Sequence, residues 1–250
     1  MDLGLRDRVA LVTGASQGIG RAIAAALVAE GARVAVASRS QERIEATADE
    51  IGAQAFVVDT SRPEVADELV SAVESALGPV DVLVPNTGGP PPGPDALGFS
   101  REQWEQAYRQ LVLGPMALIE RLAPGMRERR FGRIVNISSS AVREPIPTLM
   151  LSNSHRAAIL AAFKTMARQI AGDGVTLNTI LPGLIATERA FSNHGGSREA
   201  AQAAAAESVP VGRLGEVEEL AAVAVFLCSE RASYVTGTAV LVDGGRTHSI

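Results

Sequence analysis

The segment that decides the fold reads Thr13-Gly14-Ala15-Ser16-Gln17-Gly18-Ile19-Gly20. It follows the apolar run Val9 to Val12 and precedes a helix-forming segment, Arg21 to Glu30. A strand, a glycine-rich turn and a helix in this order present unpaired backbone N–H groups to phosphate oxygens. Gly14 permits the tight turn, Gly18 lets phosphates approach the backbone, and Gly20 lets the helix pack against its strand. We therefore predict a dinucleotide-binding turn; an ordinary strand-to-helix loop is the alternative interpretation.

The bulk composition is typical of one globular domain. The chain has 250 residues, of which 46% are hydrophobic, and a formal net charge of −5, so we expect a single α/β domain over residues 1–250. Lys and Arg form no cluster, which excludes nucleic acid and an anionic membrane surface as expected partners. Met1 to Arg8 contains no apolar stretch, and no apolar run approaches the ~18 residues of a membrane span. The sequence thus predicts a soluble cytoplasmic protein.

Cysteine chemistry and metal binding are not expected. The only cysteine, Cys228, lies in the apolar helical stretch Ala221 to Ser229, where a buried structural thiol is the natural interpretation. With one cysteine the chain can form no internal disulfide. We assign no metal-binding residues.

The expected second strand, Arg33 to Ala37, ends at Ser38 and Arg39. An enzyme selective for NAD places Asp or Glu near this point to bind the ribose 2′-hydroxyl, whereas a 2′-phosphate needs a nearby arginine. Serine followed by arginine favours NADP, with NADPH preferred and NAD as the alternative cofactor. The competing interpretation is that Arg39 is a solvated loop residue.

Strand-like and helix-like segments alternate along the rest of the chain. Further strands are expected at Ala53–Val58, Val80–Val84, Phe131–Ile137, Val175–Leu181 and Ala239–Val242. Helices are expected at Gln41–Ile51, Glu64–Leu77, Leu151–Ala171 and Val217–Ser229. A long helical region capped by Ser100 is expected through Trp104 to Arg129, with a bend at Gly114-Pro115. This alternation predicts a single-domain, Rossmann-type, doubly wound parallel sheet of seven strands. The Ala-rich stretch Thr187 to Val211 is expected to be an irregular, mobile lid.

Two loops follow strand ends, where ligands bind in open α/β sheets. Asp59 could accept a hydrogen bond from an adenine amino group, or only cap the loop before Pro63. The segment Gly88 to Gly98 has four prolines and four glycines in eleven residues, so it can be neither helix nor central strand. It is expected either to form a wall of the site or to serve as a connector.

These features together resemble the short-chain dehydrogenase/reductase family, in the single-domain form of the 3-oxoacyl-carrier-protein reductases. The resemblance rests on the Thr13–Gly20 segment and on Asn86-Thr87-Gly88, Ile134–Ser139, Asn178, Pro182-Gly183, Thr187, Val209–Gly215 and Tyr234–Gly245. It implies hydride transfer with a small-molecule substrate, and a homotetramer or homodimer formed partly by the helices near residues 100–130 and 151–171. Expected cofactor contacts are Gly14, Ser16, Gln17, Gly18, Ile19, Gly20, Ser38, Arg39, Asp59, Asn86, Gly88, Arg156, Pro182, Gly183 and Thr187.

The same resemblance points to catalytic positions. In the family a serine orients the substrate carbonyl, a tyrosine four residues before a lysine donates the proton, and an asparagine holds a water. Alignment on the family's helix places Ser152 at the tyrosine position and Arg156 at the lysine position. Ser139, thirteen residues before Ser152, takes the serine position, and Leu111 takes that of asparagine. We thus predict Ser139, Ser152 and Arg156 as an atypical catalytic set.

These replacements change the expected proton chemistry. A neighbouring cation can turn a phenol with a pKa of ~10 into a useful acid, but not an aliphatic hydroxyl such as Ser152. Arg156 can hold the nicotinamide ribose but cannot relay protons as lysine might. Other candidate acids are Tyr108 and His155, each with a packing role as the alternative. Arg143 and Glu144 border the expected pocket, as proton donor or anion clamp, or as solvated surface residues.

The sequence therefore predicts an NADP(H)-dependent oxidoreductase that acts on a carbonyl or alcohol substrate. The alternative is a catalytically impaired nucleotide-binding sensor or oligomer partner. A weaker alternative is a lyase or isomerase, because a fold does not fix a reaction. His194 in the Ala-rich stretch could contact substrate or solvent.

Overall fold

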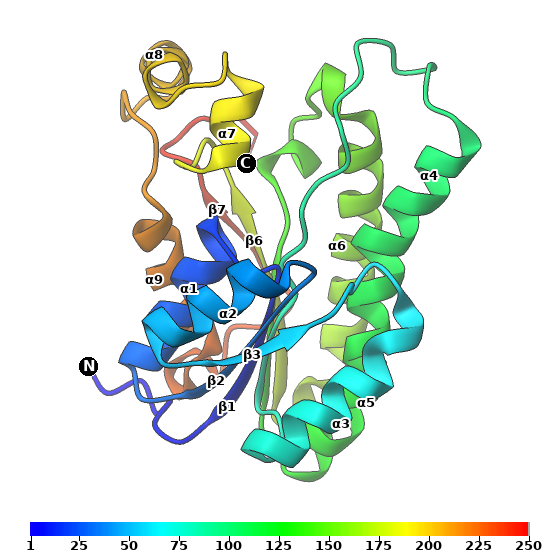
Figure 1. The fold of residues 1–250 in the computed structure, drawn as a ribbon, viewed down its shortest axis with the longest axis vertical. Coiled ribbons are helices and arrows are strands. Elements are labelled where there is room, and N and C mark those ends of the chain that lie inside the picture. The colour runs from blue at the N-terminus through cyan, green and yellow to red at the C-terminus, as the bar shows by residue number, and fades with distance from the viewer. Residues whose placement is uncertain (250) are drawn as a thin grey trace.

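A parallel β-sheet organises the computed structural model, which describes residues 1–249 (Figure 1). In this part of the chain seven strands pair in the order β3-β2-β1-β4-β5-β6-β7, and every pairing is parallel. Their bounds are β1 (Val9–Thr13), β2 (Arg33–Ser38), β3 (Gln54–Val57), β4 (Val82–Val84), β5 (Gly132–Ile137), β6 (Val175–Pro182) and β7 (Ala239–Val242). Because all strands run the same way, their carboxyl ends share one edge of the sheet.

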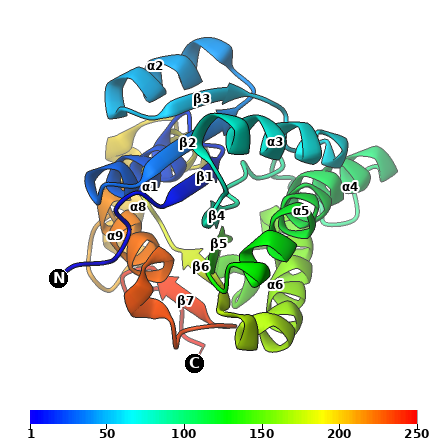
Figure 2. The ribbon, with the colours of Figure 1, turned by 90° about the horizontal axis from the view of Figure 1, so that it is seen from below.

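Helices cover both faces of the sheet (Figure 2). One face carries α1 (Gly18–Ala29), α2 (Gln41–Ile51) and α9 (Val217–Cys228). The other carries α3 (Ala66–Leu77), α5 (Gly114–Glu128) and α6 (Met150–Ile170). The predicted Rossmann-type, doubly wound sheet of seven strands is therefore confirmed.

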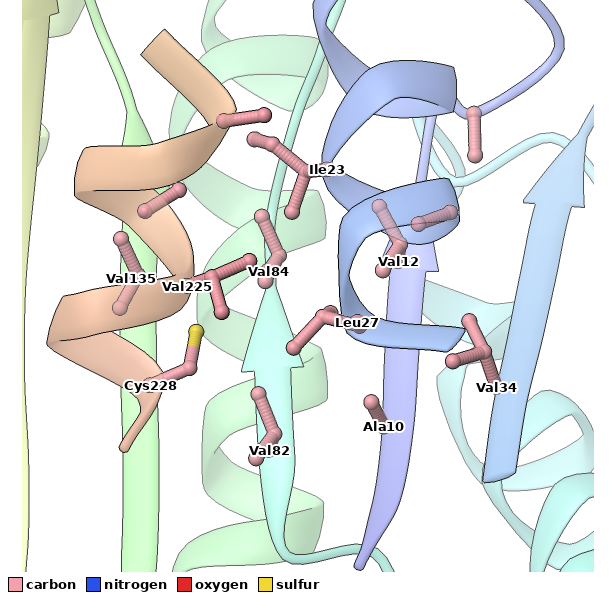
Figure 3. Packing of buried hydrophobic residues seen from close by; sticks show 14 of the residues in the cluster. Ala10, Val12, Ile23, Leu27, Val34, Val82, Val84, Val135, Val225 and Cys228 are labelled. Carbon is pink, nitrogen blue, oxygen red and sulfur yellow. The ribbon is translucent and has the colours of Figure 1, made fainter. Parts of the chain in front are cut away.

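The side chains of strand β1 pack against the helices on both faces of the sheet. All five of its residues are buried, and its side chains alternate between the two faces of the sheet. Ala10 and Val12 pack below α1 in the cluster of Figure 3, whereas Val9 and Leu11 join the core on the opposite face. A strand covered on both sides reads as a continuous apolar run, which is the pattern of the sequence here.

Cys228 belongs to the same core. It is fully buried at the end of α9 and lies among the apolar side chains of Figure 3. Burial raises the pKa of the Cys228 thiol to about 12, so the thiolate is not available at neutral pH. The prediction of a buried structural thiol is confirmed.

The long helix expected at Trp104–Arg129 is divided into three parts. It comprises α4 (Arg101–Tyr108), a π-helical turn over Arg109–Leu113, and α5. A Cβ on Gly114 would lie 2.0 Å from the Thr60 carbonyl oxygen, so only glycine lets the helix pass so close to the loop after β3. The interruption thus lies directly before the predicted bend at Gly114-Pro115.

The prediction that Thr187 to Val211 is irregular was wrong. The stretch contains α7 (Glu188–Asn193) and α8 (Arg198–Ser208). Thr187 and Ser197 cap them, because their hydroxyls accept from the N–H groups of Ala190 and Ala200 at 3.2 and 3.1 Å. Good N-caps and the high helix propensity of alanine outweigh the local glycines.

Two structural features are absent from residues 1–249. No helix there is long and apolar enough to cross a membrane. No group of three or more His, Cys, Asp or Glu side chains is arranged to hold a metal ion.

Candidate active site

A cavity of about 740 Å³ lies at the carboxyl ends of the strands. The glycine turn, the ends of β4, β5 and β6, the start of α6, and α7 all contribute to its walls. The predicted site residues that line it are Gly14, Gln17, Gly18, Ile19, Asn86, Gly88, Ser139, Ser152, Arg156, Pro182, Gly183 and Thr187. Five others do not line it, namely Ser16, Gly20, Ser38, Arg39 and Asp59.

The glycine turn is held open by backbone geometry. Gly14 and Gly18 have φ values of +57° and +56°, which strain any residue with a Cβ. A Cβ on Gly14 would also lie 2.4 Å from the Asn86 carbonyl oxygen. Gly20 lies behind the turn, where a Cβ would approach the Gly14 oxygen to 2.5 Å. Backbone conformation or steric crowding therefore favours glycine at each of these three positions, which agrees with the glycine spacing in the sequence.

Asn86 fastens the turn to the end of β4. Its side-chain amide donates to the Gly14 carbonyl at 2.9 Å. Its backbone N–H donates to the Thr13 hydroxyl, and that hydroxyl donates to the Asn86 carbonyl, both at 3.1 Å. Three hydrogen bonds thus fix the two strand ends relative to each other, at the floor of the cavity.

The end of β2 lies beside the cavity rather than in its wall. Ser38 is the last residue of β2, and its hydroxyl has no hydrogen-bond partner within residues 1–249. Arg39 is exposed. Asp59 accepts from the backbone N–H and the hydroxyl of Ser61 at 3.1 and 2.8 Å. Asp59 therefore caps its loop, as one of its two predicted roles requires.

Ser139, Ser152 and Arg156 all line the cavity. The Ser139 hydroxyl accepts from the backbone N–H of Ala141 at 3.1 Å. The Ser152 hydroxyl accepts from Arg156 Nε at 3.2 Å, because residues four apart share one face of α6. Ser152 and Arg156 are 5% and 7% exposed. The structure thus brings together the three side chains that the sequence selected as a set.

The Arg156 guanidinium is fixed by the protein on three sides. Besides Ser152, it donates to the carbonyls of Ile137 at 2.9 Å and Thr87 at 3.2 Å. Burial, and to a lesser degree the charge of Arg189, lower the pKa of Arg156 to about 10. The side chain therefore remains a cation at neutral pH, and its hydrogen-bond partners within residues 1–249 are neutral hydroxyl and carbonyl oxygens.

Other sequence candidates lie outside the cavity. His155 packs against Trp104 and Tyr108 in tilted ring pairs with centroid distances of 5.3 and 6.0 Å, and its Nδ1 is 2.7 Å from the Leu151 carbonyl oxygen. Leu111 is buried in the π-helical turn. Neither His155, Tyr108 nor Leu111 lines the cavity. For His155 and Tyr108, the packing alternative describes what the structure shows.

Glu144 anchors the end of the described chain. Its Oε1 accepts from the backbone N–H groups of His248 and Ser249 at 2.6 and 2.8 Å. These bonds are the main reason that the pKa of Glu144 lies below its usual value. Glu144 is therefore engaged with the backbone, and it does not line the cavity.

The Gly88–Gly98 loop forms one wall, as one of its two interpretations predicted. The loop contains neither helix nor strand, and its residues Gly89, Pro92 and Gly93 line the cavity. Sequence reasoning did not select Arg189 of α7 or Arg246 of the carboxyl-terminal tail, which also line it. Neither arginine belongs to a recognisable motif, so only the fold reveals them. His194, left undecided by the sequence, lines the cavity as well.

A glycine turn after the first strand and polar side chains after β4 and β5 are typical of dinucleotide-binding oxidoreductases of the Rossmann type. Residues 14–247 match the family model described as Enoyl-(Acyl carrier protein) reductase. The chain belongs to the short-chain dehydrogenase/reductase family of oxidoreductases. The predicted family is thereby confirmed.

Individual relatives match nearly the whole chain. The acetoacetyl-CoA reductase of Rhizobium meliloti is 37% identical over 243 residues, which are 96% of this chain and 98% of that protein. The NADPH-dependent reductase BacG of Bacillus subtilis is 34% identical and covers 98% of this chain and 100% of its own length. The crystal structure of L-sorbose reductase from Gluconobacter frateurii, complexed with NADPH and L-sorbose, has a TM-score of 0.91 at 34% identity, with 100% of both chains covered.

Proposed function

We propose that this protein is an NADP(H)-dependent oxidoreductase that interconverts a carbonyl compound and an alcohol with an atypical catalytic set. The observation that carries the proposal is one cavity lined by both the glycine turn and the Ser139–Ser152–Arg156 group. Relatives named as NADPH-dependent or complexed with NADPH support the cofactor. The family's tyrosine, lysine and asparagine positions are held by Ser152, Arg156 and Leu111 in our alignment.

The glycine turn fits a dinucleotide. Gly18 has a left-handed backbone, and a Cβ placed on it would point toward Thr187 at 3.4 Å across the turn. The absence of that atom leaves the N-terminus of α1 open to a diphosphate, which its free N–H groups would bind. Gly14, Gln17, Gly18, Ile19 and Thr187 line the cavity at this end.

The preference for NADPH rests on the end of β2. Ser38 and Arg39 stand where an NAD-selective enzyme has a carboxylate. The unpartnered Ser38 hydroxyl and the exposed Arg39 guanidinium are donors for a 2′-phosphate. Asp59 at the neighbouring strand end would serve the adenine in addition to capping its loop. NAD remains the alternative cofactor.

The two serine hydroxyls supply hydrogen-bond donors to a substrate oxygen. Ser139 and Ser152 each accept a hydrogen bond from a protein N–H. Because a hydroxyl has one proton and two lone pairs, each keeps its own O–H to donate into the cavity. When bound, NADPH supplies the hydride. Two fixed donors would then stabilise the negative charge that develops on the substrate oxygen.

Arg156 acts through its charge and position. Its bonds to Ser152, Ile137 and Thr87 hold the guanidinium against neutral oxygen atoms. A cation held so close to Ser152 stabilises a developing alkoxide, and its remaining N–H groups can hold the nicotinamide ribose. Arginine does not relay protons, so water in the open cavity supplies the proton that completes the alcohol.

The first test is a calorimetric titration with NADPH and NADH side by side, since it requires no knowledge of the substrate. We expect NADPH to bind more tightly than NADH, and Arg39→Ala to remove most of the difference. Arg6→Ala, at the opposite edge of the sheet and also exposed, is the matched control. Absence of binding by either nucleotide would refute the proposal.

A second candidate function is a nucleotide-binding sensor that has lost turnover. The observation that favours it is Ser152, an aliphatic hydroxyl at the position of the proton donor. The double variant Ser152→Tyr with Arg156→Lys discriminates between the two. Activity that appears only in the double variant supports the sensor, whereas loss of an existing activity shows that the serine and arginine set is functional.

Assembly and location complete the proposal. We propose a homodimer or homotetramer in which the helices near residues 100–130 and 151–171 meet, as the family resemblance implies. A small molecule is the substrate, and the enzyme acts in the cytoplasm. Measuring the mass in solution tests the oligomeric state, and cell fractionation tests the location. Neither measurement depends on catalysis.

A further inference from the structure

The cavity carries an excess of positive charge. Arg156, Arg189 and Arg246 line the cavity, and Glu188 is the only acidic residue among the described residues that do so. The whole chain, in contrast, has a formal net charge of −5. The positive charge is therefore concentrated at the cavity, although the protein as a whole is acidic. A cavity with this charge attracts anionic ligands.

Arg189 is built into the cavity wall. Its Nη1 and Nη2 atoms donate to the carbonyls of Gly89 and Pro90 at 2.9 and 3.0 Å. A Cβ on Gly89 would lie 2.5 Å from Nη2, so glycine at this position admits the guanidinium. Both partners are neutral, and the guanidinium has five N–H donors. Arg189 therefore keeps its charge and further donors for a ligand.

Arg246 is presented by a tail that is fastened on both sides of it. The Asp243 carboxylate accepts from the backbone N–H groups of Gly245 and Thr247 at 3.0 and 2.8 Å. The Glu144 carboxylate binds the backbone beyond, at His248 and Ser249. Within residues 1–249 the Arg246 guanidinium forms no salt bridge. The tail thus holds a second cation at the cavity, and its charge also interacts with the nearby Asp243 carboxylate.

The charges also act on each other. Burial is the main cause of the lowered pKa of Arg156, and the charge of Arg189 lowers it further. Two like charges beside one cavity repel, and an anion bound between them would remove the repulsion. A guanidinium with free donors matches a carboxylate in shape as well as in charge.

We propose that the substrate is a carbonyl compound that carries a carboxylate, and that Arg189 binds this carboxylate while Arg246 adds to the positive potential. The proposal rests on the proposed function and narrows its substrate to oxo acids. The same guanidinium chemistry would suit the diphosphate of the cofactor. The experiment therefore measures cofactor and oxo-acid binding separately.

The probes are 2-oxobutanoate, 3-oxobutanoate and 4-oxopentanoate, each compared with its methyl ester. Each is titrated into the complex with NADP⁺, in which a carbonyl compound has no hydride to accept. We expect at least one acid to bind ten times or more tightly than its ester. Arg189→Gln should weaken that acid about ten- to a hundredfold, the range for a lost hydrogen bond to a charged group.

Controls separate the carboxylate from other effects. The affinity for the ester and for NADP⁺ should stay within about twofold in Arg189→Gln, since neither is proposed to contact this side chain. Arg189→Lys keeps the charge but not the fork, so it should weaken the acid less than Arg189→Gln. Arg6→Gln removes an exposed arginine at the far edge of the sheet and should change nothing.

Three results would overturn the proposal or its basis. If no acid binds better than its ester, the carboxylate site does not exist. If Arg189→Gln weakens NADP⁺ as much as the acid, the guanidinium holds the cofactor's phosphates. If NADP⁺ does not bind the wild-type protein, the proposed function fails, and the acid and ester comparison on the free protein still decides the carboxylate site.

Discussion

Ser139 and Ser152 come from different elements and reach one cavity through local constraints. Ser139 follows β5 and precedes a short 3₁₀ turn that its own hydroxyl caps. Ser152 lies in the first turn of α6. In both cases a protein N–H occupies a lone pair and so directs the remaining O–H. The hydroxyls are therefore suited to donating a hydrogen bond to a substrate oxygen rather than to taking up a proton.

Replacing either serine should reduce turnover. Ser139→Ala and Ser152→Ala should each lower kcat/KM for the reduction of a carbonyl substrate by roughly 10²- to 10³-fold, as for loss of one oxyanion donor. The dissociation constant for NADPH should change little. Ser154→Ala is the matched control, because Ser154 bonds the Met150 carbonyl on the same helix and does not line the cavity. A variant with wild-type turnover would show that its serine plays no part in the reaction.

The site residues differ in how far sequence could predict them. The glycine turn follows from the spacing of its residues, whereas Ser139 and Ser152 were predicted through the resemblance to the family. Arg189 and Arg246 could not be predicted, since their role depends on two segments brought to the cavity by the fold. His155 shares its helix with Ser152, but the structure turns it toward Trp104, and only the packing of α4 on α6 decides this.

At the scale of elements, alternation along the chain was sufficient to predict the sheet. Buried strands such as β1 and β6 read as continuous apolar runs, which makes them easy to recognise. The Ala-rich stretch after Thr187 was predicted to be irregular because it contains glycines. It is helical because two good N-caps and its many alanines outweigh those glycines. The π-helical turn at Arg109–Leu113 could not be predicted either; it lies directly before Gly114, where the helix passes close to the Thr60 carbonyl.

Adding one carbon at Gly20, where α1 packs against the glycine turn, should destabilise the protein. In Gly20→Ala the new Cβ would lie 2.5 Å from the Gly14 oxygen and 2.6 Å from the Asn86 side-chain nitrogen. We expect a loss of about 1–3 kcal/mol in the free energy of unfolding by urea, the usual cost of overpacking, together with weaker NADPH binding.

Gly172→Ala provides the comparison for this substitution. Nothing lies within 4 Å of a Cβ at Gly172, in the turn after α6. Its free energy of unfolding should stay within about 0.5 kcal/mol of wild type. Equal stability of the two variants would mean that the turn relaxes, and that close packing is not the reason for glycine at position 20.

At the scale of the whole molecule, the two ends of the chain complete one sheet. The segment before β1 is tied to the region after α9, because Arg8 pairs with Glu230 at 2.8 Å and the Glu230 N–H donates to the Leu3 carbonyl. The last strand, β7, pairs with β6. We therefore propose that residues 1–250 form one domain, in which neither terminal segment can be removed without opening the sheet or its edge.

The outer face of α6 carries small exposed residues at four-residue spacing, Ala157, Ala161 and Thr165. Small side chains let two helices pack at a short distance, and the family resemblance implies that this helix meets a second subunit. Light scattering coupled to size exclusion should give two or four copies of the 26.0 kDa chain. Ala161→Arg should shift the mass to a smaller species, because a long charged side chain would be buried in the contact. Ala203→Arg, exposed on α8, should keep the wild-type mass. A wild-type monomer, or an Ala161→Arg protein of unchanged mass, would exclude this face as the subunit contact.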